Sequence, residues 1–160
     1  MHEKMKQNVG APMQRQGEVT ELFNFLLADE YQLYVITRRA HRDTKETNFN
    51  GLDKFFEIQF EILEKIIQSI GERVDTVGRF SPDSLNDFLK VGRLNGSDQG
   101  TNDQGSIIDN LIRHHKLLIN LLHNDIIKTI EVQNDSETAS FLSKLLEQHE
   151  KVVWMLGSHL

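Results

Sequence analysis

Four polar side chains share one face of a segment whose other residues have a strongly apolar, helical pattern. They are Asp53, Glu57, Gln68 and Glu72, within a predicted helix from about Leu52 to Val77. At 100° per residue these positions fall within an arc of about 100°. A helix rises about 1.5 Å per residue, so Asp53 and Glu72 are about 28 Å apart along the axis. One chain alone therefore cannot bring all four to a single ion.

A second copy of this helix would close the distance. The pair Asp53–Glu72 and the pair Glu57–Gln68 share one midpoint, between residues 62 and 63. If the helix packs antiparallel against its own copy across a two-fold axis at that point, Asp53 meets the mate's Glu72. Glu57 then meets the mate's Gln68. The spacing therefore predicts two identical polar sites, each built from two chains.

His41 adds a nitrogen donor at the end of the preceding predicted helix. Carboxylate oxygens, an amide oxygen and one imidazole are ligands that suit iron, manganese or zinc. In the simpler interpretation, the acids form a solvated helix face and His41 is an exposed or hydrogen-bonded histidine. The spacing alone leaves both interpretations open.

The composition excludes several kinds of protein and site. The chain has 160 residues, no cysteine and a formal net charge of −6. One domain with a sizeable core is expected at this length, and disulfides and thiolate metal sites are excluded. No apolar run could span a bilayer or serve as a signal peptide, so we expect a cytoplasmic protein without membrane contact. The negative charge does not favour a general DNA-binding surface.

Helical periodicity recurs in four long segments, and apolar residues follow helical spacing in each of them. The segments are 18 to about 42, 52 to 77, 106 to about 132, and 136 to about 156. They predict an all-α four-helix bundle with a long crossover between the second and third helices.

The remaining segments are shorter or lack a pattern. Ser81 followed by Pro82 is a helix-start signal, which predicts a short extra helix within the crossover. Residues 1–17 are polar and unpatterned, so we expect a mobile tail there and a folded domain over residues 18–160.

Longer motifs resemble one known family. They are LLADEYQLYVITRRAH, NFNGLDKFFEIQFE, IGERVDTVG, SPDSLNDFL and DSETASFLSKLLEQHEKVVWML, and they cover nearly the whole chain after residue 17. On these motifs and on the spacing of the polar residues, the chain resembles the Dps family, the miniferritins, also called DNA-binding proteins from starved cells. The resemblance implies a ferritin-like four-helix bundle with a short extra helix in the long crossover.

The resemblance also implies an assembly and an activity. In the Dps family, twelve chains form a hollow homododecamer from two-fold dimers, ferrous ions are oxidised at sites shared across each dimer, and ferric mineral is stored inside. The family's catalytic and metal-binding positions match His41, Asp53 and Glu57 of one chain and Gln68 and Glu72 of its partner. This is the same pairing that the spacing predicts.

The chain departs from the family pattern at four positions. Asp53 replaces a histidine, Glu57 and Gln68 each replace an aspartate, and Arg42 replaces the tryptophan that usually follows His41. Each changed ligand position still offers oxygen, so we expect a metal site with a harder ligand set, and the native metal stays open. The preferred oxidant, peroxide or dioxygen, stays open, and zinc is a competing ion.

We therefore expect a ferroxidase, an iron-storing shell that removes Fe(II) together with its oxidant and limits oxidative damage. The alternative is a DNA-protecting or structural Dps-type assembly in the cytoplasm or nucleoid, with a degenerate or zinc-binding site. A metal-free, partner-binding helical bundle is a third reading. The tail's charges, Glu3, Lys4, Lys6 and Arg15, are weakly basic in sum, which does not favour strong DNA binding.

Other acids have two interpretations each. By resemblance, Glu131, Asp135 and Glu137 are candidates for lining the pores through which iron passes; otherwise they supply turn solubility and helix N-terminal charge. Glu61 and Glu64 could nucleate mineral if they face the cavity, and are otherwise exposed surface acids.

The remaining histidines and the tryptophan are expected to serve packing or the surface. The histidines are His2, His114, His115, His123, His149 and His159. His114 and His115 point about 100° apart, so they do not join one site within their helix. Trp154 lies in an apolar stretch and is expected in the core.

Overall fold

The structure, a computed structural model, describes residues 2–47, 51–76, 90, 92–94 and 103–160. Within these residues the chain forms four helices and no strand. They are α1 (His2–Thr47), α2 (Leu52–Thr76), α4 (Gln104–Glu131) and α5 (Ser136–Gly157). The predicted all-α architecture is confirmed. The short helix predicted at Ser81-Pro82 lies outside the described residues.

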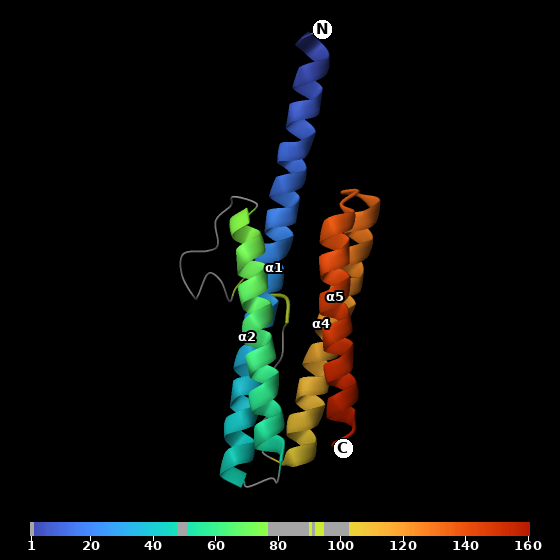
Figure 1. The fold of residues 1–160 in the computed structure, drawn as a ribbon. Helices are drawn as coiled ribbons and strands as arrows, with labels where there is room; N and C mark the ends of the chain where they lie inside the picture. Colours follow the sequence, from blue (N-terminus) through green and yellow to red (C-terminus); the bar gives the residue numbers. More distant parts are fainter. Residues whose placement is uncertain (1, 48–50, 77–89, 91, 95–102) are drawn as a thin grey trace.

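The four helices pair as two antiparallel hairpins, α1 with α2 and α4 with α5 (Figure 1). α2 ends at one end of the bundle, and α4 begins at the opposite end. α2 and α4 are therefore joined from opposite ends of the bundle, as the predicted long crossover requires. No helix among the described residues is long and apolar enough to cross a membrane.

α1 continues beyond the bundle at its N-terminal end. It begins at His2, and Figure 1 shows its first part extending past the ends of the other helices. This helix differs from the unpatterned segment expected over residues 1–17. A helix makes its backbone hydrogen bonds within itself, so a polar segment can form one without an apolar face. The tail's mobility and the domain boundary at residue 18 remain predictions.

Three of the helices start at a residue whose conformation or side chain favours a helix N-terminus. Gly51 has a φ of 83°, a left-handed conformation that glycine adopts without strain, directly before α2. Asp103 caps α4 by accepting a hydrogen bond from the backbone N–H of Ser106 at 2.9 Å. Asp135 caps α5 by accepting from the backbone N–H of Thr138 at 3.0 Å and from its hydroxyl at 2.6 Å.

The cap at Asp135 also perturbs its ionisation. Burial acts to raise the pKa of Asp135, but hydrogen bonds from Thr138 and the backbone N–H of Glu137, together with the charge of Arg73, outweigh it and hold the pKa below its usual value of 3.8. Of the two roles expected for Asp135, the helix-terminal one is thus present in the single chain. The role in a pore remains a prediction.

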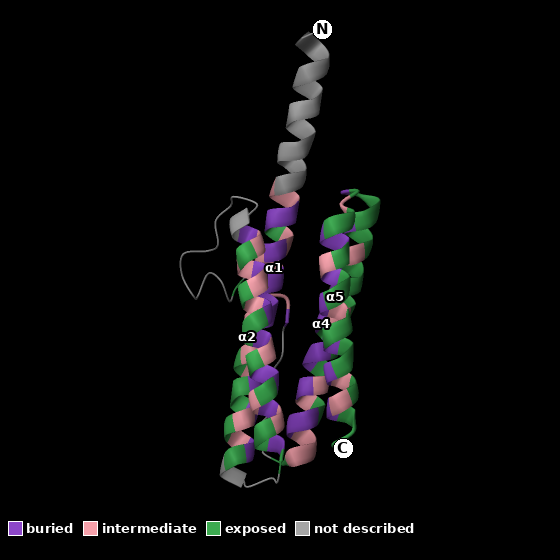
Figure 2. Ribbon diagram, viewed as in Figure 1, coloured by how far each residue is buried: buried purple, intermediate pink, exposed green. Residues whose placement is uncertain are grey.

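Two apolar clusters form the core, one in each half of the bundle. Figure 2 shows that all four helices of the bundle contain buried residues. The larger cluster contains Val19, Phe23, Leu26, Leu27, Leu33, Leu63, Ile66, Ile70, Val74, Leu94, Leu118, Leu122, Leu142 and Leu145. The smaller contains Ala40, Leu52, Phe56, Ile107, Ile108, Leu111, Val152 and Leu156. On α4 and α5, a layer of buried histidines separates the two clusters.

Trp154 does not belong to this core, so the prediction for it is wrong. Its side chain is 77% exposed, whereas Val152 and Leu156 on either side of it are buried. At 100° per residue, Trp154 points away from the face that those two residues share. The apolar run VVWML therefore crosses from the core face of α5 to its outer face.

Candidate metal site and buried polar core

Three of the five predicted ligands lie at one end of the α1–α2 hairpin. His41 is near the end of α1, and Asp53 and Glu57 are in the first two turns of α2. The His41 ring is half-buried and lies 5.2 Å from the ring of Phe60. Asp53 is exposed, and the half-buried Glu57 lies 3.4 Å from the Lys54 ammonium. All three retain access to solvent.

The other two predicted ligands lie together further along α2. Both are exposed, and Nε2 of Gln68 donates to Oε1 of Glu72 over 3.5 Å. Because α2 is one continuous helix, Asp53 and Glu72 stay about 28 Å apart. Within the described part of the chain, no three histidine or acidic side chains are placed to hold one metal ion. The structure therefore places His41, Asp53 and Glu57 at one end of the hairpin and pairs Gln68 with Glu72 further along α2, but the described residues of one chain do not form the predicted metal site.

His41 also lines a shallow, cationic depression of about 480 Å³ on the outer face of α1. The other lining residues are Val35, Arg38, Arg39, Arg42 and Lys45. The Arg42 side chain is exposed, with its Nε 4.0 Å from a carboxylate oxygen of Asp43. The Arg38 guanidinium lies 4.5 Å above the ring of Phe60. This excess of positive charge opposes cation binding at His41 unless carboxylates from elsewhere offset it.

The other candidate acids have various surroundings. Glu61 and Glu131 are exposed. Glu64 accepts a hydrogen bond from the hydroxyl of Tyr34 at 2.8 Å, and burial together with this carboxylate raises the pKa of Tyr34. Glu137 lies 3.5 Å from the guanidinium of Arg73. Whether any of these acids faces a cavity or a pore depends on an assembly, so both roles remain predictions.

The middle of the bundle contains a polar chain that the sequence reasoning missed. Glu30 of α1 accepts a hydrogen bond from, or forms an ion pair with, Nε2 of His149 on α5 over 2.8 Å. Nδ1 of His149 lies 3.0 Å from Nδ1 of His115 on α4. All three side chains are almost fully buried, and Oε2 of Glu30 has no hydrogen-bond partner. These contacts thus link α1, α5 and α4 through buried side chains.

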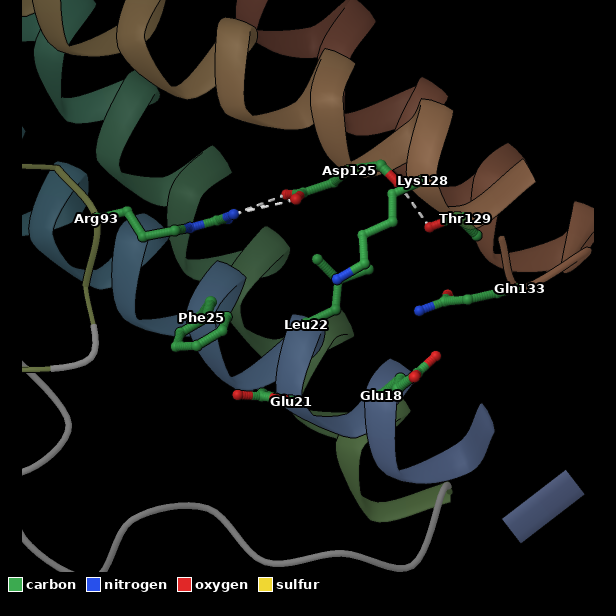
Figure 3. A pocket seen from close by; sticks show the side chains of 9 residues that line it. All are labelled: Glu18, Glu21, Leu22, Phe25, Arg93, Asp125, Lys128, Thr129 and Gln133. Atoms are coloured by element: carbon green, nitrogen blue, oxygen red, sulfur yellow. Dashed lines mark hydrogen bonds and ion pairs between the residues drawn. The ribbon is translucent and has the colours of Figure 1, made fainter. Parts of the chain in front are cut away.

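A second buried polar network links the crossover to the bundle. Arg93 bonds Asp29 of α1 through its backbone N–H at 2.5 Å and its Nε at 2.8 Å. Its Nη1 lies 3.0 Å from Asp125 of α4. Figure 3 shows Arg93 reaching Asp125 beside a pocket of about 180 Å³ between α1 and α4. Burial raises the pKa of both aspartates, and the Arg93 charge only partly opposes that effect.

Helical phase was the signal that could have marked the three members of the first network as buried. Glu30 occupies a core position of α1, because Leu26, Leu27 and Leu33 around it are all buried. His115 lies four residues after the buried Leu111, and His149 has the same relation to the buried Leu145. A polar residue on a core stripe must be paired, so each of these positions called for a partner.

The other histidines divide between the two expected roles. His114 is buried, with its Nδ1 2.7 Å from the carbonyl of Asn110, while His123 and His159 are exposed. The His159 ring lies 4.9 Å from that of Phe55. His114, His115 and His149 therefore have packing roles, and His123 and His159 lie on the surface, whereas the His2 side chain is outside the described ones.

Comparison with known proteins agrees with this architecture. A family model described as a ferritin-like domain matches residues 20–160. A low temperature-induced protein of Nostoc sp. (strain PCC 7120) is 32% identical over 153 residues, which cover 96% of this chain and 86% of that protein. The DNA protection during starvation protein of Helicobacter pylori (strain J99) is 23% identical over 140 residues, covering 88% and 96%.

A solved structure gives the same result for the fold. The crystal structure of a Dps protein from Vibrio cholerae O1, described as one of the ferritin-like diiron-carboxylate proteins, superposes with a TM-score of 0.80. It is 23% identical, and the match covers 91% of each chain. The chain therefore belongs to the ferritin-like family and has the fold of the Dps miniferritins, as its motifs predicted.

Proposed function

We propose that this chain is the subunit of a ferroxidase shell, a homododecamer built from two-fold dimers that oxidises Fe(II) and stores the ferric product. The site would take His41, Asp53 and Glu57 from one chain and Gln68 and Glu72 from its partner. The carrying observation is the outward placement of the two half-sites, which are separated along one continuous helix. Their common midpoint allows an antiparallel copy of α2 to complete both at once.

The charges around His41 also support a site made by two chains. A lone chain presents the cationic depression beside His41, which disfavours a ferrous ion there. In the proposed dimer, the partner's Glu72 is brought to this end of the hairpin. Its carboxylate would offset part of the cationic charge and supply an oxygen ligand that suits iron. The depression thus gives a physical reason for the site to form only on dimerisation.

The chemistry asked of these residues is modest. Ferrous iron is the substrate, and each ion loses one electron to peroxide or dioxygen. The carboxylates of Asp53, Glu57 and the partner's Glu72 stabilise the rise in positive charge as iron passes from two-plus to three-plus. His41, whose ring lies against Phe60, would add one imidazole nitrogen to these carboxylates. We place the shell in the cytoplasm or at the nucleoid, where removing iron together with its oxidant would limit radical damage.

Anaerobic titration of the metal-free protein with Fe(II) tests this function. We expect saturable binding at the dimer sites, rapid oxidation after peroxide or dioxygen is added, and elution of the protein at the size of twelve subunits. A parallel titration with Zn(II) should compete for the same sites, because the ligands also suit zinc. A shell that binds no Fe(II) but retards DNA in a gel would instead support the DNA-protecting alternative.

A further inference from the structure

The buried chain Glu30–His149–His115 is independent of the proposed iron site and does different chemistry. Its hydrogen-bond distances are 2.8 and 3.0 Å, and its members are 0%, 1% and 2% exposed. They come from α1, α5 and α4, so this row of three side chains crosses the bundle from one hairpin to the other. Three ionisable groups in so protected a layer must have their charges balanced.

The linear order of the three groups excludes a single-ion site. His149 uses both ring nitrogens, one toward Glu30 and the other toward His115. The two nitrogens of one imidazole point in opposite directions, so Glu30 and His115 cannot converge on a common metal ion around it. The absence of any metal-holding cluster among the described residues agrees with this. The ligand that this geometry suits is the proton.

The contact between the histidines holds one proton. A hydrogen bond between two Nδ1 atoms requires one of them to be bare. If both rings become imidazolium, both Nδ1 atoms carry hydrogen and two positive charges face each other in the core. Glu30 can balance one of these charges but not both. Uptake of a second proton must therefore break the His115–His149 contact.

We propose that His115 and His149 form an acid-sensitive joint, at which uptake of a second proton loosens α4 from α5 in the middle of the bundle. The joint lies between the two apolar clusters, so the clusters on either side can remain packed while the layer between them opens. The neutral pair is the closed state. The doubly protonated pair is the open state.

Among the residues that the structure describes, none beside the joint other than Glu30 supplies an anion for the second charge. On α4, His114 is the neighbouring titratable group, and its Nδ1 is already against a backbone carbonyl. On α1, Asp29 is beside Glu30 in sequence but is bonded to Arg93. The described buried residues of α2 include no titratable side chain. Burial, then the charges of His149 and His114, hold the pKa of His115 well below its ordinary value of 6.5.

The lowered pKa of His115 determines how the stability of the fold changes with pH. A histidine whose pKa is lower in the folded than in the unfolded chain stabilises the fold fully above pH 6.5. This contribution is lost as the pH falls below 6.5 toward the folded value. The aspartates bonded to Arg93 act in the opposite sense, because their raised pKa values make protonation more favourable in the folded than in the unfolded chain.

Histidine NMR on the assembled protein measures the proton uptake directly. We expect the ring of His115 to titrate well below the ordinary histidine pKa of 6.5. In a His149→Gln variant, in which one repelling charge is removed, His115 should titrate at a higher pH than in the wild type. Titration of His115 at or above pH 6.5 in the wild type would overturn the proposal.

Urea unfolding at pH 7.5 and pH 5.0 measures the consequence. The urea midpoint of the wild type should be lower at pH 5.0 than at pH 7.5. His115→Gln should remove a clear part of that decrease, because a glutamine amide can donate to His149 without titrating. His123→Gln is the matched control and should keep the full wild-type dependence. An unchanged pH dependence in His115→Gln would contradict the joint. If that variant does not fold, the wild-type titration still decides.

Discussion

Replacing Glu72 with alanine is expected to reduce the initial rate of ferrous iron oxidation about a hundredfold or more while leaving the shell assembled. Glu72 is exposed at the far half of α2, bonded over 3.5 Å to Gln68, so its loss removes no core contact. In the proposed dimer it supplies the partner's carboxylate, one of three anionic groups that stabilise the ferric product. Without it, the cationic depression beside His41 faces the iron with less opposing charge.

Stopped-flow absorbance after mixing with Fe(II) and oxidant measures this rate, and size-exclusion chromatography checks the assembly. Glu150→Ala is the matched control, because Glu150 is also an exposed helical acid but lies on α5. It should keep the wild-type rate. If the Glu72→Ala shell has the normal size and oxidises iron as fast as the wild type, Glu72 is not part of the site.

Replacing Arg93 with leucine is expected to destabilise the subunit by about 3–5 kcal/mol, because it leaves two buried carboxylates without their counter-charge. Asp29 is 0% exposed and Asp125 is 9% exposed, and Arg93 bonds both. Burial already raises the pKa of each aspartate. Loss of the guanidinium must raise both further, so that keeping them ionised at neutral pH costs the fold still more.

Urea unfolding of the Arg93→Leu variant at pH 7 measures this loss. Arg113→Leu, at an exposed arginine of α4, should change stability by about 0.5 kcal/mol or less. Adding Asp29→Asn and Asp125→Asn to Arg93→Leu should recover part of the stability, since the buried charges are then absent. A change in Arg93→Leu as small as that in the control would mean that the network contributes little.

The sequence was sufficient for the architecture because apolar spacing reports directly on helices. The predicted segments 52–77 and 136–156 differ from α2 and α5 by a single residue at one end. Gly51 and Asp135 directly precede these two helices, the first in a left-handed conformation and the second as a cap. Where apolar residues are sparse, as before residue 18, the same reasoning had nothing to measure and did not predict the N-terminal extension of α1.

Side-chain direction was harder to predict than helix position. Trp154 was expected in the core from its apolar neighbours, yet its phase on α5 turns it outward. Glu30 and His149 show the converse, since both lie on core stripes and are buried. Local composition averages over the faces of a helix, whereas burial depends on the face itself.

The partners of the buried polar groups could not be read from the sequence. Arg93 follows a glycine in the long crossover, and nothing in its neighbourhood indicates that it reaches both Asp29 and Asp125. Such contacts join residues far apart in the chain and depend on how the helices pack. The predicted iron ligands also depend on packing, but on the packing of two chains against each other rather than of helices within one chain.

Complementation between two inactive variants tests the central claim most directly. Asp53→Ala removes a ligand from one half-site and Glu72→Ala removes one from the other, so each variant alone should oxidise iron slowly. When the two are co-assembled at equal amounts, mixed dimers contain one doubly altered site and one intact site. Random mixing should therefore restore about a quarter of the wild-type sites, measured as fast-phase amplitude per subunit. If mixed shells form but oxidise iron no faster than either variant alone, the site is not shared between chains in the way proposed.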